Sequence, residues 1–211
     1  MALSFKSNFY VYFRQENEDP YHIIESCDKK FYLCAAKGES FYIKIKQNFP
    51  TKTRGVRLFL DGDEVNSIKT IKYECHYYGF KLGGGNYKKF LFDIPETEET
   101  NFKKKRKNHK VGTIHIEFFE TERIKSKRKQ KADYKGYKTF CKSSINPGTK
   151  FFERPLAIKE GNDFTVKEWD RDSDNSYEYI VDYTKKIDEI IVYYTDFMSL
   201  QIKGVVRFFF N

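Results

Sequence analysis

Short runs in which apolar and polar residues alternate recur along this chain and constrain its fold more than any other feature. In residues 40–46, the apolar side chains of Phe41, Ile43 and Ile45 alternate with polar or amphipathic ones. Successive side chains of a β-strand point to opposite faces, so this period of two predicts a strand with one buried face. The apolar residues are also unusually aromatic, with 21 Phe and 16 Tyr against 2 Met and 1 Trp, and this bias favours strands over helices.

Several such runs are separated by residues that form turns. Residues 30–35 and 40–46 flank a Lys-Gly dipeptide, which predicts a hairpin. Residues 56–60 end at an Asp-Gly dipeptide suited to the positive φ angles of a tight turn, and the chain then resumes over residues 68–75. Further strands are expected over residues 9–13, 87–94, 111–119, 164–169, 177–183 and 187–194, with a hairpin tip at the glycine-rich residues 83–86.

About nine or ten short strands with turns between them predict an all-β protein. The length suits a single antiparallel β-sandwich domain that spans residues 1–211. A jelly roll is one candidate topology for it. The C-terminal residues leave two alternatives, because residues 200–210 can form a strand that closes the sheet and residues 196–202 can form a short helix.

The net charge of +9 comes from two lysine-rich clusters. Without their twelve positive charges the rest of the chain carries about −3, so the body of the protein is close to neutral. The predicted domain therefore has two long basic loops, at about residues 96–110 and 122–136. The first cluster consists of Lys103, Lys104, Lys105, Arg106, Lys107 and Lys110, and the second consists of Arg123, Lys125, Lys127, Arg128, Lys129 and Lys131.

These basic clusters are the candidate polyanion-binding residues, and three interpretations of them stay open. Clustered Lys and Arg neutralise phosphates and release counterions, which gives sequence-independent, salt-sensitive binding to nucleic acid or another polyanion. Such clusters also act as nuclear-import signals, or only keep an aromatic-rich protein in solution. A strand over residues 111–119, at about 3.3 Å per residue, would hold the clusters roughly 30 Å apart, which favours two separate contacts over one narrow groove.

Four segments of the chain carry a resemblance to a known family. They are residues 31–43, 56–62 and 111–119, together with a tail over residues 187–206. These segments resemble a family of uncharacterised all-β domains known mainly from fungal proteins, with relatives expected in some large DNA viruses. The resemblance implies a shared β fold and supplies no catalytic residues. The lysine-rich insertions on both sides of residues 111–119 depart from the family's pattern, so no partner is carried over from it.

Other residue groups predict no metal, cofactor or catalytic site. Residues 170–175 resemble the start of a calcium loop, but Val181 stands where a bidentate Glu is needed, so an acidic turn is expected. The four histidines belong to no recognisable nucleophile or metal motif, and His115 is expected to be a structural or surface residue. The cysteines contain no CxxC pair and are expected to be reduced and mostly buried; they are Cys27, Cys34, Cys75 and Cys141.

The sequence also lacks the marks of an exported or membrane protein. No opening segment combines a basic start, an apolar stretch and a small-residue cleavage site. No run approaches the roughly 18 apolar residues of a membrane helix. The chain is therefore expected to be soluble and intracellular, in the cytoplasm or the nucleus, with a virus particle as a further location.

Together these features predict a non-enzymatic interaction or assembly module that contacts protein partners or copies of itself. Its basic loops would contact polyanions or acidic surfaces, and its most specific form is a structural subunit such as a jelly-roll component of a virus particle. The alternative is a nuclear protein that binds nucleic acid nonspecifically through both lysine-rich loops. No cofactor and no small-molecule substrate are expected. Salt separates the two functions, because phosphate binding weakens steeply as salt rises whereas apolar assembly persists.

Overall fold

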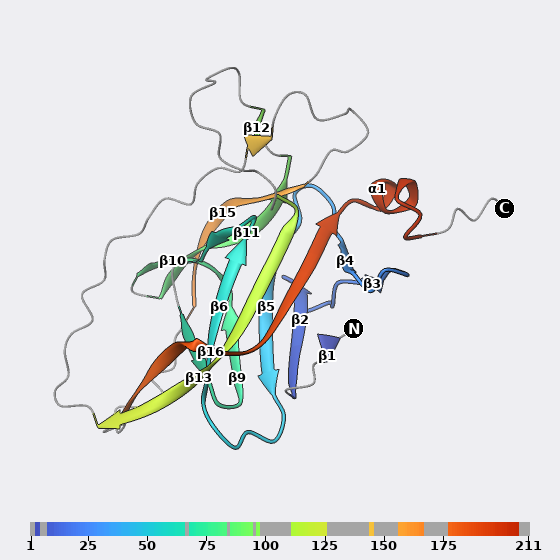
Figure 1. Ribbon diagram of the computed structural model, residues 1–211. Helices are drawn as coiled ribbons and strands as arrows, with labels where there is room; N and C mark the ends of the chain where they lie inside the picture. Colours follow the sequence, from blue (N-terminus) through green and yellow to red (C-terminus); the bar gives the residue numbers. More distant parts are fainter. Residues whose placement is uncertain are drawn as a thin grey trace, which may run out of the picture.

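The computed structural model describes residues 3–4, 8–65, 68–83, 85–94, 96–97, 111–125, 144–145, 156–166 and 177–206. Within these residues the chain forms two large β-sheets, one small parallel strand pair and one short helix (Figure 1). The small pair joins β12 (Glu96–Thr97) to β14 (Ser144–Ile145). The chain is therefore an all-β protein in the part that the structure describes.

The first sheet has the strand order β1-β2-β5-β11-β10, with β9 paired to β5 and β15 paired to β11. All of its pairs are antiparallel. Its strands are β1 (Leu3–Ser4), β2 (Phe9–Gln15), β5 (Ser40–Gln47), β9 (Glu74–Tyr77), β10 (Gly79–Gly83), β11 (Asn86–Asp93) and β15 (Ala157–Thr165).

The second sheet has the order β3-β4-β16-β13-β6-β7, with β8 paired to β6. Its strands are antiparallel except for β4, which runs parallel to β16. They are β3 (Ile23–Glu25), β4 (Phe31–Cys34), β6 (Arg54–Leu60), β7 (Asp63–Glu64), β8 (Lys69–Ile71), β13 (Thr113–Lys125) and β16 (Tyr177–Thr195).

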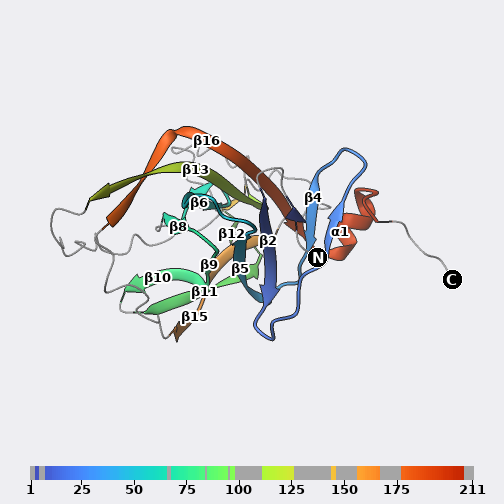
Figure 2. The ribbon, with the colours of Figure 1, turned by 90° about the horizontal axis from the view of Figure 1, so that it is seen from below.

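The two sheets pack face to face around one aromatic and aliphatic core, as the edge view of Figure 2 shows. Phe9 of the first sheet stacks on Phe118 of the second, with ring centroids 4.1 Å apart. The buried hydroxyl of Tyr77 donates a hydrogen bond across the core to the carbonyl oxygen of Val56 at 3.0 Å. These contacts confirm the predicted antiparallel β-sandwich. The jelly-roll topology stays a prediction.

Asp61 ties both sheets together at one end of the sandwich. It lies in the tight turn between β6 and β7, where its φ of 52° and that of Gly62, 86°, fit the predicted Asp-Gly turn. One carboxylate oxygen accepts hydrogen bonds from the backbone N–H of Gly112, at 2.8 Å, and from the hydroxyl of Tyr194. The other accepts one from the N–H of Ile158 at 2.9 Å. A single side chain therefore joins the β6–β7 turn to β16, β15 and the residue before β13.

The hairpin predicted for residues 30–35 and 40–46 is wrong, because β4 belongs to the second sheet and β5 to the first. The link between them crosses the sandwich. Its start is fixed to the second sheet, where the N–H of Ala35 donates to the carbonyl oxygen of Thr195 at 3.0 Å. Its end is fixed to the first sheet, where the N–H of Gly38 donates to the carbonyl oxygen of Phe92 at 2.7 Å. The alternating pattern predicted both strands but not their partners.

The C-terminal part of the described chain settles the choice between strand and helix. Helix α1 (Phe197–Ile202) begins after Asp196, whose carboxylate accepts a hydrogen bond from the N–H of Ser199 at 2.8 Å. The helical alternative is confirmed, and a closing strand that starts at residue 200 is wrong. Before it, β16 continues through the two strands predicted for residues 177–183 and 187–194.

Candidate functional site

Most of the predicted polyanion-binding residues lie outside the described residues. This applies to the whole first cluster and to four members of the second. Arg123 and Lys125 are described as part of β13, with Arg123 exposed. The predicted loop of residues 122–136 therefore begins too early, because β13 continues to Lys125 through its pairing with β16. The members outside the described residues are Lys103, Lys104, Lys105, Arg106, Lys107, Lys110, Lys127, Arg128, Lys129 and Lys131.

The second basic cluster starts on a two-stranded arm, which we define as residues 121–125 of β13 paired with residues 177–181 of β16. Strand β6 pairs with β13 only as far as Glu120, so within the described residues the arm strands pair only with each other. The arm extends past β6 in Figure 1. Tyr179 and Ile180 are 39% and 54% exposed, and consecutive strand residues point to opposite faces. Both faces of the arm are thus open to solvent.

An irregular segment of β16 lies at the base of the arm. The register jumps where Phe119 pairs with Lys186 and Glu120 pairs with Asp182. Asp182 accepts hydrogen bonds from the backbone N–H and the hydroxyl of Thr184, at 3.0 and 2.6 Å. These bonds, with the ion pair to Lys185, lower the pKa of Asp182 to about 2. The carboxylate that holds this bulge therefore stays ionised well into the acidic range.

The arm is also held against the body by a close approach at Gly55. A Cβ atom placed on Gly55 of β6 would lie 2.6 Å from Cγ2 of Val181. Real side chains do not tolerate this distance, so Gly55 allows Val181 to pack directly over the β6 backbone. On the other strand, the hydroxyl of Thr121 donates to the carbonyl oxygen of Thr53 at 2.8 Å. Both strands of the arm are therefore held against the body of the protein at the base of the arm.

Strand β16 has a long edge without a described strand beside it. Its outer side pairs with β4 only over residues 192–195, and its other side pairs with β13. Along residues 177–191, backbone N–H and C=O groups on the outer side therefore have no strand partner among the described residues. Such an edge can accept an additional strand.

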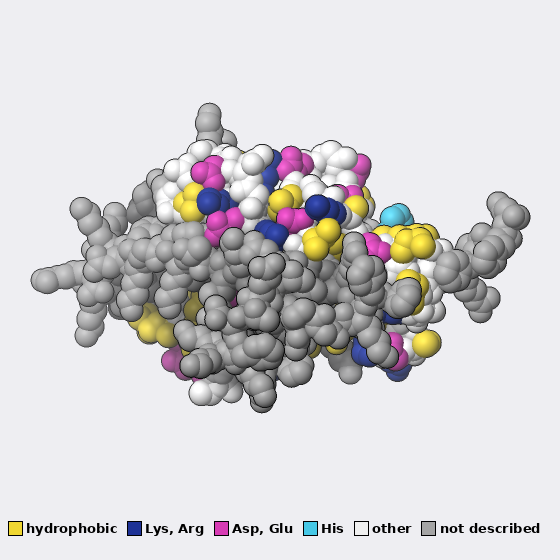
Figure 3. All heavy atoms as spheres, turned by 90° about the horizontal axis from the view of Figure 1, so that it is seen from above, with side chains coloured by type: hydrophobic (Ala, Val, Ile, Leu, Met, Phe, Trp, Pro, Cys, Tyr) yellow, Lys and Arg dark blue, Asp and Glu magenta, His cyan; other side chains and the backbone are white. Residues whose placement is uncertain are grey.

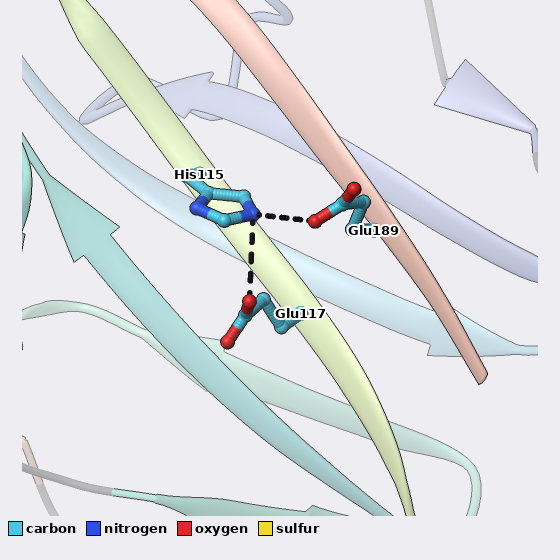
Figure 4. A group of neighbouring side chains, drawn as sticks. All are labelled: His115, Glu117 and Glu189. Atoms are coloured by element: carbon cyan, nitrogen blue, oxygen red, sulfur yellow. Dashed lines mark hydrogen bonds and ion pairs between the residues drawn. The ribbon is translucent and has the colours of Figure 1, made fainter. Parts of the chain in front are cut away.

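A second candidate site lies where β13 and β16 pair above the bulge. His115 and Glu117 of β13 and Glu189 of β16 point toward one another (Figure 4). The Nε2 atom of His115 lies 3.2 Å from Oε2 of Glu189 and 3.8 Å from Oε1 of Glu117. The side chains of His115 and Glu117 are 18% and 14% exposed, whereas Glu189 is 47% exposed. The group is therefore anchored in the sheet and open on one side.

Two cations flank these acids. The ammonium of Lys186 lies 2.7 Å from Oε2 of Glu189, and this hydrogen bond holds the pKa of Glu189 below its ordinary value. Arg57 of β6 lies 3.6 Å from Oε2 of Glu117, and its guanidinium also forms a two-bond contact with Glu64 at 2.8 and 2.9 Å. The ring of His115 stacks on Phe59, with centroids 5.3 Å apart. These contacts fix the orientations of His115 and Glu117.

The sequence predicts a structural or surface role for His115 and does not predict its two acidic neighbours. The spacing of His115 and Glu117 gave a usable signal, since residues two apart on a strand share a face. Glu189 comes from a strand 72 positions further along the chain, as the register pair Glu117 with Glu189 shows. No local pattern contains that pairing.

The remaining sites predicted from sequence are placed only in part. Cys27 is exposed, which corrects the expectation that the thiols are mostly buried, while Cys34 and Cys75 are half-buried residues. Cys27 lies in the polar segment between β3 and β4, so it has no apolar face to join. Burial raises the pKa of the Cys75 thiol to about 12, so this thiol stays protonated. Cys141 and the acidic residues 170–175 lie outside the described residues.

The described part of the face shown in Figure 3 is mixed in charge. In Figure 3, Lys and Arg side chains are interspersed with Asp and Glu side chains over the described part of that face. This agrees with a body close to neutral. Within the described part of the chain, no helix has the length and the apolar character that a membrane crossing needs.

No family model matches the chain, and neither a curated protein nor a solved structure matches it. The resemblance to the uncharacterised all-β family therefore stays a prediction.

Proposed function

We propose that this chain is an interaction or assembly module without enzymatic activity, and that its arm contacts a second copy of the chain. The observation that carries the proposal is the arm itself, a two-stranded ribbon exposed on both faces with an edge that has no described strand beside it. Two-stranded ribbons are marginally stable alone in water, so a partner that covers the arm stabilises it.

The composition of the arm favours pairing through β16. On the β13 side, residues 121–125 include three charged residues, Glu122, Arg123 and Lys125, and charged side chains protect strand edges from pairing. On the β16 side, residues 177–181 include one charge, Glu178, beside Tyr179 and Ile180. Two copies of this segment can pair antiparallel about a two-fold axis, because each presents the same edge to the other. The expected assembly is therefore a dimer through β16.

The test is light scattering coupled to size exclusion, at low and high salt, on the parent chain and on Ile180→Lys. The parent is expected to form a discrete oligomer that persists at high salt, since apolar contacts and backbone hydrogen bonds are only weakly screened. Ile180→Lys places a charge on the arm and is expected to give monomers. Ile202→Lys is the matched control, because Ile202 on α1 is 58% exposed, against 54% for Ile180.

A monomeric parent at both salt concentrations would contradict the proposal. So would dissociation by Ile202→Lys to the same extent as by Ile180→Lys. The most specific form of the proposal is a structural subunit, such as a jelly-roll component of a virus particle, in which the basic segments face neighbouring subunits or genome.

One observation favours a second function, nonspecific binding of nucleic acid. Arg123, the first member of the second basic cluster, is directly paired with Tyr179 across the arm. Cationic grooves with exposed aromatic rings bind single strands by phosphate contact and base stacking. With six to ten phosphate contacts, affinity for an oligonucleotide should fall by about 10³-fold or more between about 50 and 200 mM salt. A chain that changes mass only when oligonucleotide is added at low salt would favour this function over self-assembly.

A further inference from the structure

We propose that His115, Glu117 and Glu189 form a binding site for a divalent transition metal ion of the zinc class. The site lies on the outer face of the second sheet, and it does not depend on the arm being an assembly surface. Its three side chains come from two strands that are directly paired, so the sheet itself sets their spacing.

The ligand spacing fits a tetrahedral zinc site. Zinc binds nitrogen and carboxylate oxygen at about 2.0–2.2 Å, which places neighbouring ligand atoms of a tetrahedron about 3.4 Å apart. Nε2 of His115 lies 3.2 Å from the nearer oxygen of Glu189 and 3.8 Å from that of Glu117. All three ligand atoms lie within 4.8 Å of one another. Small rotations of the two carboxylates are enough to bring them onto one ion.

The register of the sheet places two negative charges directly opposite each other. Glu117 of β13 pairs with Glu189 of β16, and like charges at directly opposed positions destabilise a sheet. The connected acids are Glu64, Glu117 and Glu189, and the cations that contact them are Arg57 and Lys186. This group therefore has one more carboxylate than it has Lys and Arg side chains. A bound divalent ion lies where that excess is concentrated.

The residues around the ligands are suited to hold them. Phe59 stacks on the His115 ring and Arg57 contacts Glu117, so two of the three ligands are oriented before an ion binds. Such outer contacts raise metal affinity by fixing the ligands. Glu189 is half exposed, which leaves a fourth position on the ion for water. Three protein ligands and one open position are the arrangement of zinc sites that are open to exchange.

The ligand set selects the class of ion. Calcium and magnesium take oxygen ligands, whereas imidazole favours zinc and its transition-metal neighbours. Lys186 is the competitor, because its ammonium lies beside both carboxylates. Its side chain is 43% exposed, so it can leave for solvent at low cost when an ion enters.

The experiment titrates Zn²⁺, and separately Mg²⁺, into the full chain by calorimetry. A long-range ¹H–¹⁵N spectrum of the histidine rings is recorded at each step. All variants carry Cys27→Ser, because an exposed thiol can itself bind zinc. We expect Zn²⁺ to bind and to shift the Nε2 signal of His115, and Mg²⁺ to do neither.

His115→Ala and Glu189→Gln are each expected to weaken binding by about 10-fold or more. His22→Ala is the matched control, since His22 is exposed and lies outside the site.

Lys186→Gln separates a metal site from an ion-pair network. Removal of the competing ammonium should tighten Zn²⁺ binding if these side chains form a metal site. If they form only an ion-pair network, Lys186→Gln destabilises the sheet and leaves zinc binding unchanged. The proposal is overturned if Zn²⁺ leaves the His115 signal in place, if His115→Ala binds as tightly as its parent, or if binding occurs only in Lys186→Gln.

Discussion

Replacement of Asp61 by Asn tests whether one carboxylate holds the two sheets together. The exchange keeps the shape of the side chain, and Asn tolerates the φ of 52° at this turn. It removes the charge that accepts hydrogen bonds from Gly112, Tyr194 and Ile158. Asn keeps one acceptor oxygen, so the bonds from Gly112 and Tyr194 are weakened, while the amide nitrogen faces the N–H of Ile158 and that bond is lost. Hydrogen bonds to charged groups contribute about 1.5–3 kcal/mol and neutral ones about 0.5–1.5 kcal/mol, so the exchange should lower the free energy of unfolding by about 3 kcal/mol or more.

Urea unfolding followed by circular dichroism measures this loss, with the m value expected to stay unchanged. Asp63→Asn in the same turn is the control, because Asp63 is exposed, and its effect should stay within about 0.5 kcal/mol. Tyr194→Phe removes the hydroxyl from the same contact, so its cost should be smaller in the Asp61→Asn background than in the parent. A loss below about 1 kcal/mol for Asp61→Asn, or strict additivity with Tyr194→Phe, would refute the role given to this carboxylate.

Two further predictions concern the first sheet. A Cβ atom on Gly79 would lie 2.0 Å from the carbonyl oxygen of Lys88, so Gly79→Ala should lower the free energy of unfolding, measured in urea, by about 3 kcal/mol. Gly38 lies in open space at positive φ, so the control Gly38→Asn should change this free energy little. Burial lowers the pKa of His76, so as pH falls below about 6.5 the unfolded chain takes up the proton first and the folded state loses stability. His76→Gln should therefore reduce the slope of the free energy of unfolding against pH between about pH 7 and pH 5. An unchanged slope would contradict this role of His76.

Local patterns predicted the strands of this protein better than their partners. The alternation of Phe41, Ile43 and Ile45 places all three in the core, and the Asp-Gly turn joins β6 to β7 as expected. Strand β4 was paired incorrectly, because its parallel contact with β16 joins residues about 160 positions apart in sequence, which no local pattern contains.

The candidate sites likewise combine residues that local patterns predict with residues that only the strand pairing brings together. The lysine clusters are visible in the sequence because they are contiguous, and His115 and Glu117 share a face by simple alternation. Glu189 joins them only through the register of β13 and β16. The bulge before it, which changes that register, depends on Asp182 and Thr184 rather than on an apolar pattern. A site whose residues come from different strands therefore cannot be predicted until the pairing of those strands is known.

The length of the β13–β16 pair has a mechanical consequence. Both strands run from the Asp61 end of the sandwich to the tip of the arm, so a force applied at the tip acts along the strand axis. The hydrogen bonds between antiparallel strands lie across that axis and are loaded in shear, so they must fail together rather than one after another. In the proposed dimer, tension from the second copy would thus be carried into the core by β13 and β16, which are extensively paired within the described residues.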